Sequence, residues 1–465
     1  MTQSQVQETQ TDGEPTLRRV MGPGLLLLFV VGDILGTGVY ALTGKVAAEV
    51  GGAVWLPFLS AFLVALLTAC SYLELVTKYP QAAGAALYTH KAFSLHVLTF
   101  MVTFAVMCSG LTSASSASKS FSANFVAAFD LSVGEGAGLT ALAIGFMTLI
   151  ALVNFRGVGE SVKVNVVLTC VELTGLLIVI GIGAWALGGG NGDTSRLLEF
   201  RTVEGEGAFG AVTAATALAF FALVGFEDSV NMAEETKDPV RTFPKVMLTG
   251  LCLTGVIYVL VAISAVALVS PEDLSQGDAP LLKVVEAGAP GFPLGLFAFI
   301  TMFAVANSAL INMLMASRLL YGMANERVLP RFLGKVHRTR RTPWVGIVFT
   351  TVLAFGLILY ADLAALGGTT SLLLLIVFTI VNVAVLVLRR DPVDHDHFRA
   401  PTAIPVVGAV VCAYLASPLS GRAGADYRVG GVLLVIGLGM WALTWLVNRY
   451  VLHQDAHLDP THLNG

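Results

Sequence analysis

The sequence predicts an all-α integral membrane protein with about twelve transmembrane helices. Hydrophobic residues make up 55% of the 465 residues and charged residues only 12%, whereas a soluble chain carries about twice that charged fraction. Apolar runs of about 20 residues recur along the chain, and this is the length of a helix that crosses a bilayer. Two of these runs, the first and the sixth, are interrupted by breaks that contain glycine, at 36–38 and 224–228.

The predicted spans follow one another with short connectors, none of which reaches the length of about 50 residues that a separate domain needs. They lie near 21–48, 53–77, 95–128, 138–155, 160–187, 208–235, 244–269, 292–322, 344–361, 363–388, 402–418 and 429–450. The chain is therefore predicted to comprise a disordered cytoplasmic tail over 1–20, a ten-helix transport core over 21–388, two additional helices over 389–450 and a cytoplasmic tail over 451–465.

The distribution of positive charge predicts the orientation. If the N-terminus is cytoplasmic, the connectors on that side carry most of the 27 lysines and arginines. Because cytoplasmic loops have this excess, both termini are predicted to face the cytoplasm. The basic stretch 327–341 lies between two spans, so we interpret it as a topology anchor and expect no nucleic-acid binding.

The two breaks predict a transporter. A helix in lipid pairs its backbone N–H and C=O groups internally, because hydrocarbon offers no partners. A break at membrane depth is tolerated only where the backbone faces protein or a water-filled cavity. Two breaks five spans apart are typical of inverted-repeat transporters, which hold their ligand between half-helices. The sequence therefore predicts movement of a small solute across a membrane.

The chemistry of the breaks indicates the solute. Gly36 and Gly38 let a ligand approach the main chain, and the half-helix that begins near Val39 offers unpaired N–H groups to a carboxylate. The half-helix that ends near Leu223 offers carbonyl oxygens to an ammonium group. A site that binds both groups describes an α-amino acid. The alternative is that the glycines only permit close helix packing.

Longer motifs resemble the amino acid–polyamine–organocation (APC) permeases. The first-span run from Gly32 to Tyr40 (GDILGTGVY) is similar to that family's signature, as is FFALVGFEDSVNMAEETKDPVRTFP at 220–244. The runs at 316–330 and 342–344 also match. The resemblance extends from about Val20 to the last span and implies a leucine-transporter (LeuT) fold, in which spans 1–5 and 6–10 form inverted repeats and two helices follow.

The resemblance also implies a substrate site. By matching positions, its carboxylate side is the main chain of Ile34, Gly36, Thr37 and Gly38. Its amine side is formed by Phe221, Ala222 and Val224, with Phe221 as an aromatic gate. Glu227, just after the second break, is expected to have a structural or gating role.

Two acidic residues depart from the family pattern. Asp33 stands where relatives often have a small or neutral residue, and Glu172 stands where several have lysine. A charge at bilayer depth costs about 3 kcal/mol or more, so such residues are usually functional or paired. We expect Glu172 to be the proton-coupling group, near Asp33, Asn307 and Ser308, because spans 1 and 8 lie beside span 5 in the inferred fold.

Other chemistries find little support in the sequence. The 394–397 segment (DHDH) has metal-ligand residue types but lies in a predicted loop, and we expect no metal or other cofactor. No nucleotide-binding loop of the GxxxxGK[ST] type, and no HExxH or GxSxG motif, is present, which argues against ATP-driven transport and against an enzyme. The cysteines stand singly in apolar runs and are read as structural thiols: Cys70, Cys108, Cys170, Cys252 and Cys412.

We therefore predict a multi-pass plasma-membrane secondary transporter of amino acids, coupled to protons or working by exchange. A permease for cationic amino acids or polyamines is the first alternative, because Asp33, Glu172 and Asp228 are acidic. A non-transporting sensor on the same scaffold is an alternative of another class. Oligomeric state and the particular substrate are left open.

Overall fold

The chain is built of helices. The computed structural model describes residues 21–81, 84–131, 136–156, 162–201, 207–325, 328–340 and 342–452, with the backbone alone for 162–165 and 451–452. Every regular element within these ranges is a helix, and the strand-like contacts there are two isolated bridges. The predicted N-terminal tail, 1–20, lies outside the described residues, and so does the predicted C-terminal tail, 451–465, from residue 453 on.

The first half of the chain contains both interrupted spans. Its helices are α1 (Pro23–Leu35), α2 (Thr37–Val50), α3 (Trp55–Lys78), α4 (Gly84–Phe93), α5 (His96–Ala128), α6 (Ala137–Arg156), α7 (Val162–Gly188) and α8 (Ala208–Ala219), followed by the short 3-10 turns η2 (Phe220–Leu223) and η3 (Asp228–Met232). The predicted first span is thus α1 and α2 in series, and the predicted sixth span is α8, η2 and η3.

The spans of the second half are not interrupted by breaks. The helices of this half are α9 (Pro239–Leu268), α10 (Pro271–Ser275), α11 (Pro280–Gly288), α12 (Leu294–Asn325), α13 (Trp344–Tyr360), α14 (Leu363–Leu388), α15 (Ala403–Ala416) and α16 (Gly424–Val447). The short helices α10 and α11 lie between two of the spans. The seventh span was predicted to begin at 244, but α9 begins at Pro239 and carries Pro244 inside it. Proline suits a first helical position because the N–H it lacks has no intrahelical partner there.

The helices confirm an all-α membrane protein. Ten helical segments of the described residues are long and apolar enough to cross a bilayer, including Pro23–Val50 and Ala208–Met232 as continuous spans. The remaining two predicted spans correspond to the shorter apolar helices α13 and α15. The inverted-repeat relation between the two halves of the core stays a prediction.

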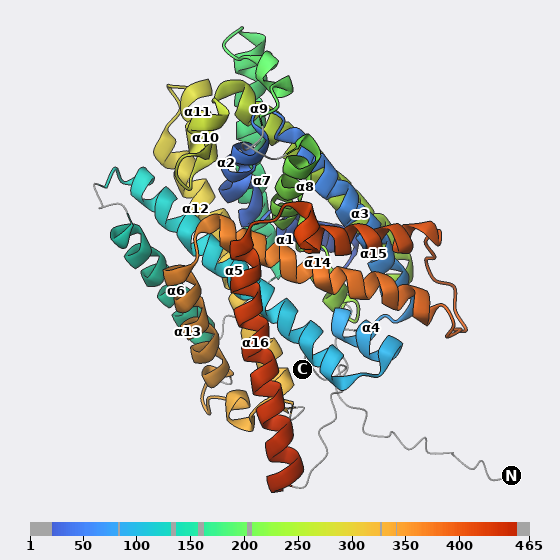
Figure 1. Ribbon diagram of the computed structural model, residues 1–465. Helices are drawn as coiled ribbons and strands as arrows, with labels where there is room; N and C mark the ends of the chain where they lie inside the picture. Colours follow the sequence, from blue (N-terminus) through green and yellow to red (C-terminus); the bar gives the residue numbers. More distant parts are fainter. Residues whose placement is uncertain are drawn as a thin grey trace, which may run out of the picture.

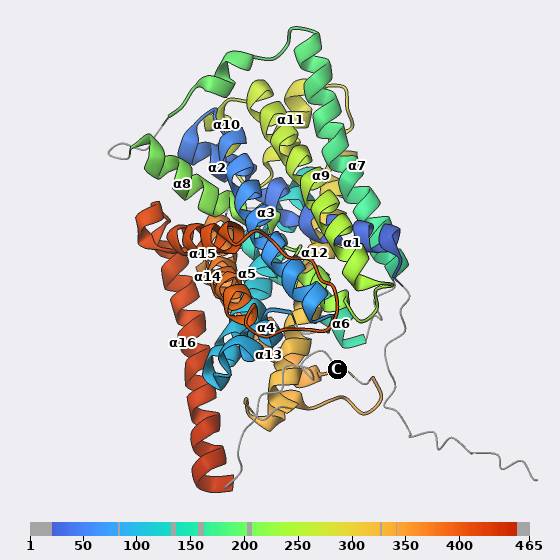
Figure 2. The same cartoon turned by 90° about the vertical axis from the view of Figure 1, so that its right-hand side faces the viewer.

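The two interrupted spans pack at the centre of the helix bundle. Helix α1 packs against α7 and α9, α2 against α8, and α12 and α14 against α5. Helices α10 and α11 cover the end of the bundle at which α2 lies (Figure 1). Helix α16 stands at the edge of the bundle beside α14 (Figure 2). The breaks in the first and sixth spans are therefore enclosed by protein.

A buried ion pair closes the end of the bundle at which α3 and α14 finish. Arg389 Nε and Nη2 each donate to the Glu74 carboxylate at 2.7 Å, and the backbone N–H of Ala400 donates to Glu74 Oε2 at 3.0 Å. The hydrogen bond with Glu74 raises the pKa of the Arg389 guanidinium, against the opposing effect of burial. The connector from α14 to α15 is thus fastened to α3.

Replacing Glu74 by glutamine tests this contact. The substitution keeps the shape of the side chain but leaves the Arg389 charge without its counterion, so we expect Glu74→Gln to destabilise the protein by about 3 kcal/mol. The measurement is thermal or denaturant unfolding in detergent. Glu286→Gln, at an exposed position of α11, is the control and should change stability by less than about 0.5 kcal/mol. Equal effects of the two variants would contradict a stabilising role for the pair.

Candidate functional site

The first break separates two short helices at Gly36. Helix α1 ends at Leu35 and α2 begins at Thr37, two residues before the predicted start near Val39. The first N–H groups of a helix have no partner within it, and Gly36 at the N-cap has no side chain that could accept from them. The N-terminus of α2 therefore presents the backbone N–H groups of Thr37, Gly38 and Val39.

The second break follows the last turn of the sixth span's first half. Helix α8 ends at Ala219 and continues as η2 to Leu223, as predicted, after which Val224 is extended. Gly225 has φ +124°, a conformation that side-chain-bearing residues rarely adopt. The carbonyl oxygen of Phe221 accepts a hydrogen bond from Val224 N–H at 3.4 Å, and beyond this turn the carbonyl groups at the end of η2 have no continuing helix to supply partners.

Side chains satisfy part of the exposed backbone at both breaks. The Glu227 carboxylate accepts a hydrogen bond from Gly225 N–H at 2.8 Å. The Tyr258 hydroxyl of α9 donates to the carbonyl oxygen of Ile34 at 2.6 Å. Both Glu227 and Tyr258 are buried, so each contact replaces a hydrogen bond that water would otherwise provide.

The two breaks are in direct main-chain contact with each other. A Cβ atom placed on Gly38 would lie 2.3 Å from Cα of Ala222, and one on Gly225 would lie 2.6 Å from the carbonyl oxygen of Asp33. Only glycine fits at these distances unless the backbone moves. Close packing, the alternative reading of the glycines, is therefore part of the arrangement at Gly38 and Gly225.

A cavity of about 30 Å³ lies between the breaks. Its lining combines both breaks with α5 and α12: Asp33, Ile34, Gly36, Thr37, Gly38, Ser113, Phe221, Val224, Gly225, Asp228, Ser308 and Asn312. Such a volume holds about two water molecules, so a bound amino acid requires the lining to move apart. The Thr37 hydroxyl is buried and has no hydrogen-bond partner among the described residues.

The residues predicted from the sequence fall into two groups, those that line the cavity and those that do not. Six of the seven predicted substrate contacts line it, and so do Asp33 and Ser308. Ala222 is instead packed against Gly38. Asn307, next to Ser308 on α12, is buried but does not line the cavity, because successive residues of a helix point about 100° apart.

A second cavity, of about 60 Å³, adjoins the first. The two share Ser113, Val224, Asp228 and Asn312. The larger one is lined further by Glu227 and by residues of α4 and of the second half of α12. The two adjoining cavities therefore extend from the breaks toward α4, with both polar and apolar side chains in their lining.

Glu172 is buried in α7 outside both cavities. The Glu172 side chain is buried, and neither of its carboxylate oxygens has a hydrogen-bond partner within the described residues. The Tyr40 hydroxyl donates to its backbone carbonyl at 2.7 Å, not to its carboxylate. Helix α7 packs against α1 and α12, which confirms that spans 1 and 8 lie beside span 5.

Several lining residues were not singled out from the sequence. Ser113 and Asn312 contribute a hydroxyl and an amide to both cavities. The sequence held a signal for Ser113, because the 109–122 stretch is rich in serine although it lies in an apolar span. In the structure all of these serines are buried. Asn312 follows Ser308 by one helical turn, and its Nδ2 donates to the Ser308 carbonyl at 2.9 Å.

Metal-ligating residues do not gather around these cavities. Among the described residues no three His, Cys, Asp or Glu side chains lie close enough to hold a metal ion. The 394–397 segment is largely exposed, and His395 Nε2 lies 3.1 Å from the carbonyl oxygen of Thr77. The chemistry available at the breaks is therefore hydrogen bonding and charge, supplied by main chain, hydroxyls and carboxylates.

Comparison with known proteins identifies the family. The family model described as amino acid permease matches residues 26–440. The chain belongs to the amino acid permease family. It is 24% identical to a branched-chain amino acid permease of Bacillus subtilis, over 96% of this chain and 95% of that protein. It is 28% identical to a chloroplastic cationic amino acid transporter of Arabidopsis thaliana, over 94% of this chain and 79% of that protein.

Another relative has a different kind of substrate in its name. A methylthioribose transporter of Bacillus subtilis is 26% identical, over 87% of this chain and 89% of that protein. Family membership makes this chain a multi-pass membrane transporter of the amino acid permease type, not an enzyme. The names of the relatives differ too much to select one amino acid.

Gly36 and Gly38 are expected to respond differently to a methyl group. Gly38→Ala forces Cβ against the Ala222 main chain, so we expect a loss of about 2 kcal/mol in stability together with loss of transport. Gly36→Ala places Cβ 3.2 Å from Ser308 Oγ, the end of a side chain that can rotate, and should cost less than about 1 kcal/mol. Thermal unfolding and substrate binding of both variants provide the measurement. A well-tolerated Gly38→Ala would contradict the contact between the breaks.

Proposed function

We propose that the chain is a plasma-membrane secondary transporter that holds an α-amino acid between its two breaks. The substrate carboxylate accepts hydrogen bonds from the N-terminus of α2 and from the Thr37 hydroxyl. The substrate ammonium group donates to carbonyl oxygens of Phe221, Ala222 and Val224. The observation that carries this proposal is the cavity lined from both breaks, with a buried Thr37 hydroxyl that has no partner there.

The two ends of the site have opposite polarity. The N-terminus of α2 is the positive end of a helix dipole, and the end of η2 is a negative end. A zwitterion aligned between them is attracted at both ends, whereas a simple anion or cation is attracted at one. Amino acids are therefore favoured above sugars or monocarboxylates as the substrate class.

A cationic amino acid is the second candidate, supported by the acidic lining. Asp33 and Asp228 both line the cavity between the breaks, and Glu227 lines the adjoining one. Carboxylates within a few ångströms favour a second positive charge on the substrate. A diamine would use these carboxylates but would leave the N–H groups at Gly38 and Thr37 without an anion.

Glu172 is the proposed proton-carrying group. A carboxyl group buried without a partner is far less costly to bury protonated than ionised. Its position on α7, beside α1 and α12, lets changes at the first break alter its access to water. With both termini cytoplasmic, as the positive charges favour, the larger cavity would lie on the cytoplasmic side of the site.

Recognition of both charged groups is tested with matched ligands. Purified protein in proteoliposomes is assayed for uptake of labelled L-leucine and L-lysine, with leucinamide, isocaproate, ε-aminocaproate and cadaverine as competitors. Blocking the carboxylate or removing the α-amine should each weaken binding by about 1.5–3 kcal/mol, the range for a hydrogen bond to a charged group. Cadaverine competing better than either amino acid would favour a polyamine permease. Binding without uptake would favour a sensor.

Coupling is tested by Glu172→Gln. The amide mimics the protonated carboxyl with almost no change of shape, so the variant should retain amino acid exchange. It should lose accumulation driven by a pH gradient, because it cannot release a proton. Asp33→Asn provides the comparison. Wild-type accumulation in Glu172→Gln, with loss in Asp33→Asn, would transfer the coupling role to Asp33.

A further inference from the structure

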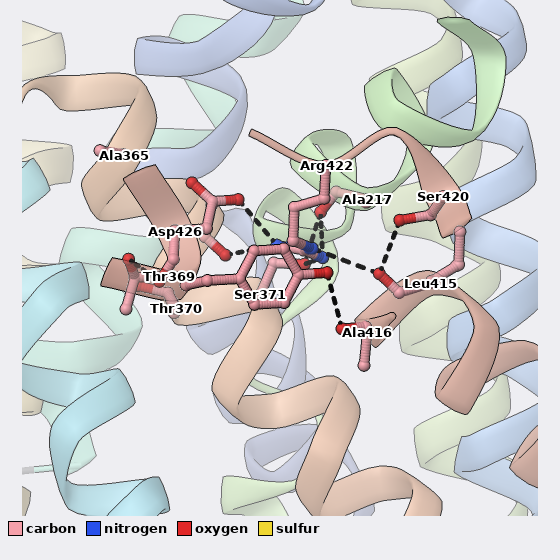
Figure 3. Close-up of polar contacts among 12 residues, drawn as sticks. Ala217, Ala365, Thr369, Thr370, Ser371, Leu415, Ala416, Ser420, Arg422 and Asp426 are labelled. Atoms are coloured by element: carbon pink, nitrogen blue, oxygen red, sulfur yellow. Dashed lines mark hydrogen bonds and ion pairs between the residues drawn. The ribbon is translucent and has the colours of Figure 1, made fainter. Parts of the chain in front are cut away.

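A second buried arginine lies near the sixth span, at the opposite end of α14 from Arg389. Arg422 occupies the short link between α15 and α16, and its side chain is only 1% exposed. Figure 3 shows the Arg422 side chain among Ala217, Ser371, Leu415 and Asp426. Burial of a charged fork is costly unless it is paired and hydrogen-bonded. The hydrogen bonds of Arg422 therefore show which helices this side chain connects.

The guanidinium uses all three nitrogens. Its Nη1 donates to Asp426 Oδ2 of α16 at 3.0 Å and to the Gly368 carbonyl of α14 at 2.6 Å. Its Nε donates to the Leu415 carbonyl of α15 at 3.2 Å. Its Nη2 donates to Ser371 Oγ of α14 at 3.2 Å and to the Ala217 carbonyl of α8 at 3.4 Å. One side chain thus joins α8, α14, α15 and α16.

The contact with Ala217 is the one that reaches the substrate site. Ala217 lies in the last turn of α8, where carbonyl groups begin to lack intrahelical partners. The Ser371 hydroxyl also donates to this carbonyl. One turn later, Phe221 begins the set of carbonyls proposed to receive the substrate amine. Arg422 and Ser371 therefore fix the turn from which η2 projects.

Helix α14 contacts both the Arg422–Asp426 ion pair and Phe221. A Cβ atom on Gly368 would lie 2.4 Å from the Asp426 carboxylate, and one on Gly367 would lie 3.4 Å from the Phe221 ring. Phe221 also packs in a small apolar cluster with Leu42 of α2 and Leu363 of α14. Neighbouring residues of α14 thus connect the Arg422 contacts to Phe221, the aromatic residue expected to gate the substrate.

We propose that Arg422 is a positioning residue for the amine side of the substrate site. It holds the last turn of α8 against α14, and through Asp426 and Leu415 it makes the two C-terminal helices part of that support. This inference rests on the proposed function, because it assigns the carbonyls of η2 to the substrate amine. The helices that follow the ten-helix core then contribute to recognition without touching the substrate.

The test compares ligands with and without an α-amine. Arg422→Lys keeps the charge but replaces the planar five-donor fork by a single ammonium group, which cannot reach all these acceptors. Ser371→Ala is the milder variant, because it removes one hydroxyl from the same carbonyl. Affinities are measured for L-leucine against isocaproate and for L-lysine against ε-aminocaproate.

A positioning role predicts loss of amine discrimination. The affinity ratio of amino acid to its desamino analogue should fall by about tenfold in Arg422→Lys, and by a smaller factor in Ser371→Ala. The ligands without an α-amine should bind as they do to the wild type. Arg389→Lys, which alters the other buried arginine far from the breaks, should lower thermal stability and leave the ratio unchanged.

The outcomes separate this inference from the proposed function. If the wild type does not distinguish an amino acid from its desamino analogue, the proposed amine site is wrong, whatever Arg422 does. If the wild type discriminates but Arg422→Lys and Ser371→Ala keep its ratio, Arg422 is a stabilising contact only and the inference is overturned. Should Arg422→Lys fail to fold, an unchanged ratio in Ser371→Ala would overturn it by itself.

Discussion

Contact between two interrupted backbones organises this protein. Gly38 lies against Ala222, and Gly225 lies against the main chain of Asp33, so each break is covered by the other at a depth where lipid offers no hydrogen bonds. The cavity exists because the two backbones touch at these points and separate between them. The surrounding helices, above all α5, α9 and α12, then supply polar groups that the breaks still lack.

The sequence predicted the fold well because its strongest signals are physical necessities of the bilayer. Long apolar runs give the spans, and glycine at a break marks backbone that must approach other backbone. Proline can begin a helix or lie within one, and this limits the prediction of helix boundaries. The seventh span was predicted to begin at 244, but α9 begins at Pro239 and continues through Pro244. The short helices α13 and α15 were also found as apolar runs, although their length falls below that of the other spans.

The site was only partly predictable, for a different reason. Main-chain contacts could be located from the breaks, because each break fixes its own carbonyls and N–H groups. The contributions of Ser113 and Asn312 depend on which face of α5 and α12 turns toward the breaks, and that is settled by packing among distant spans. Arg422 could not be found at all from local pattern. Its role follows from reaching Ala217, a residue 205 positions earlier in the chain.

Arg389 and Arg422, at opposite ends of α14, have different structural roles. Arg389 joins the connector that follows α14 to Glu74 of α3. Arg422 joins α14 to the turn of α8 that leads into η2. The cavity between the breaks is too small for an amino acid, so binding must move some of its lining. The hydrogen bonds of the Arg422 guanidinium resist movement of this turn. The Phe221 side chain is instead held by apolar contacts, in a small cluster with Ala41, Leu42 and Leu363. Movement on binding is therefore expected to concentrate in side chains and in α1 and α2, while the η2 carbonyl groups proposed to bind the amine stay in place.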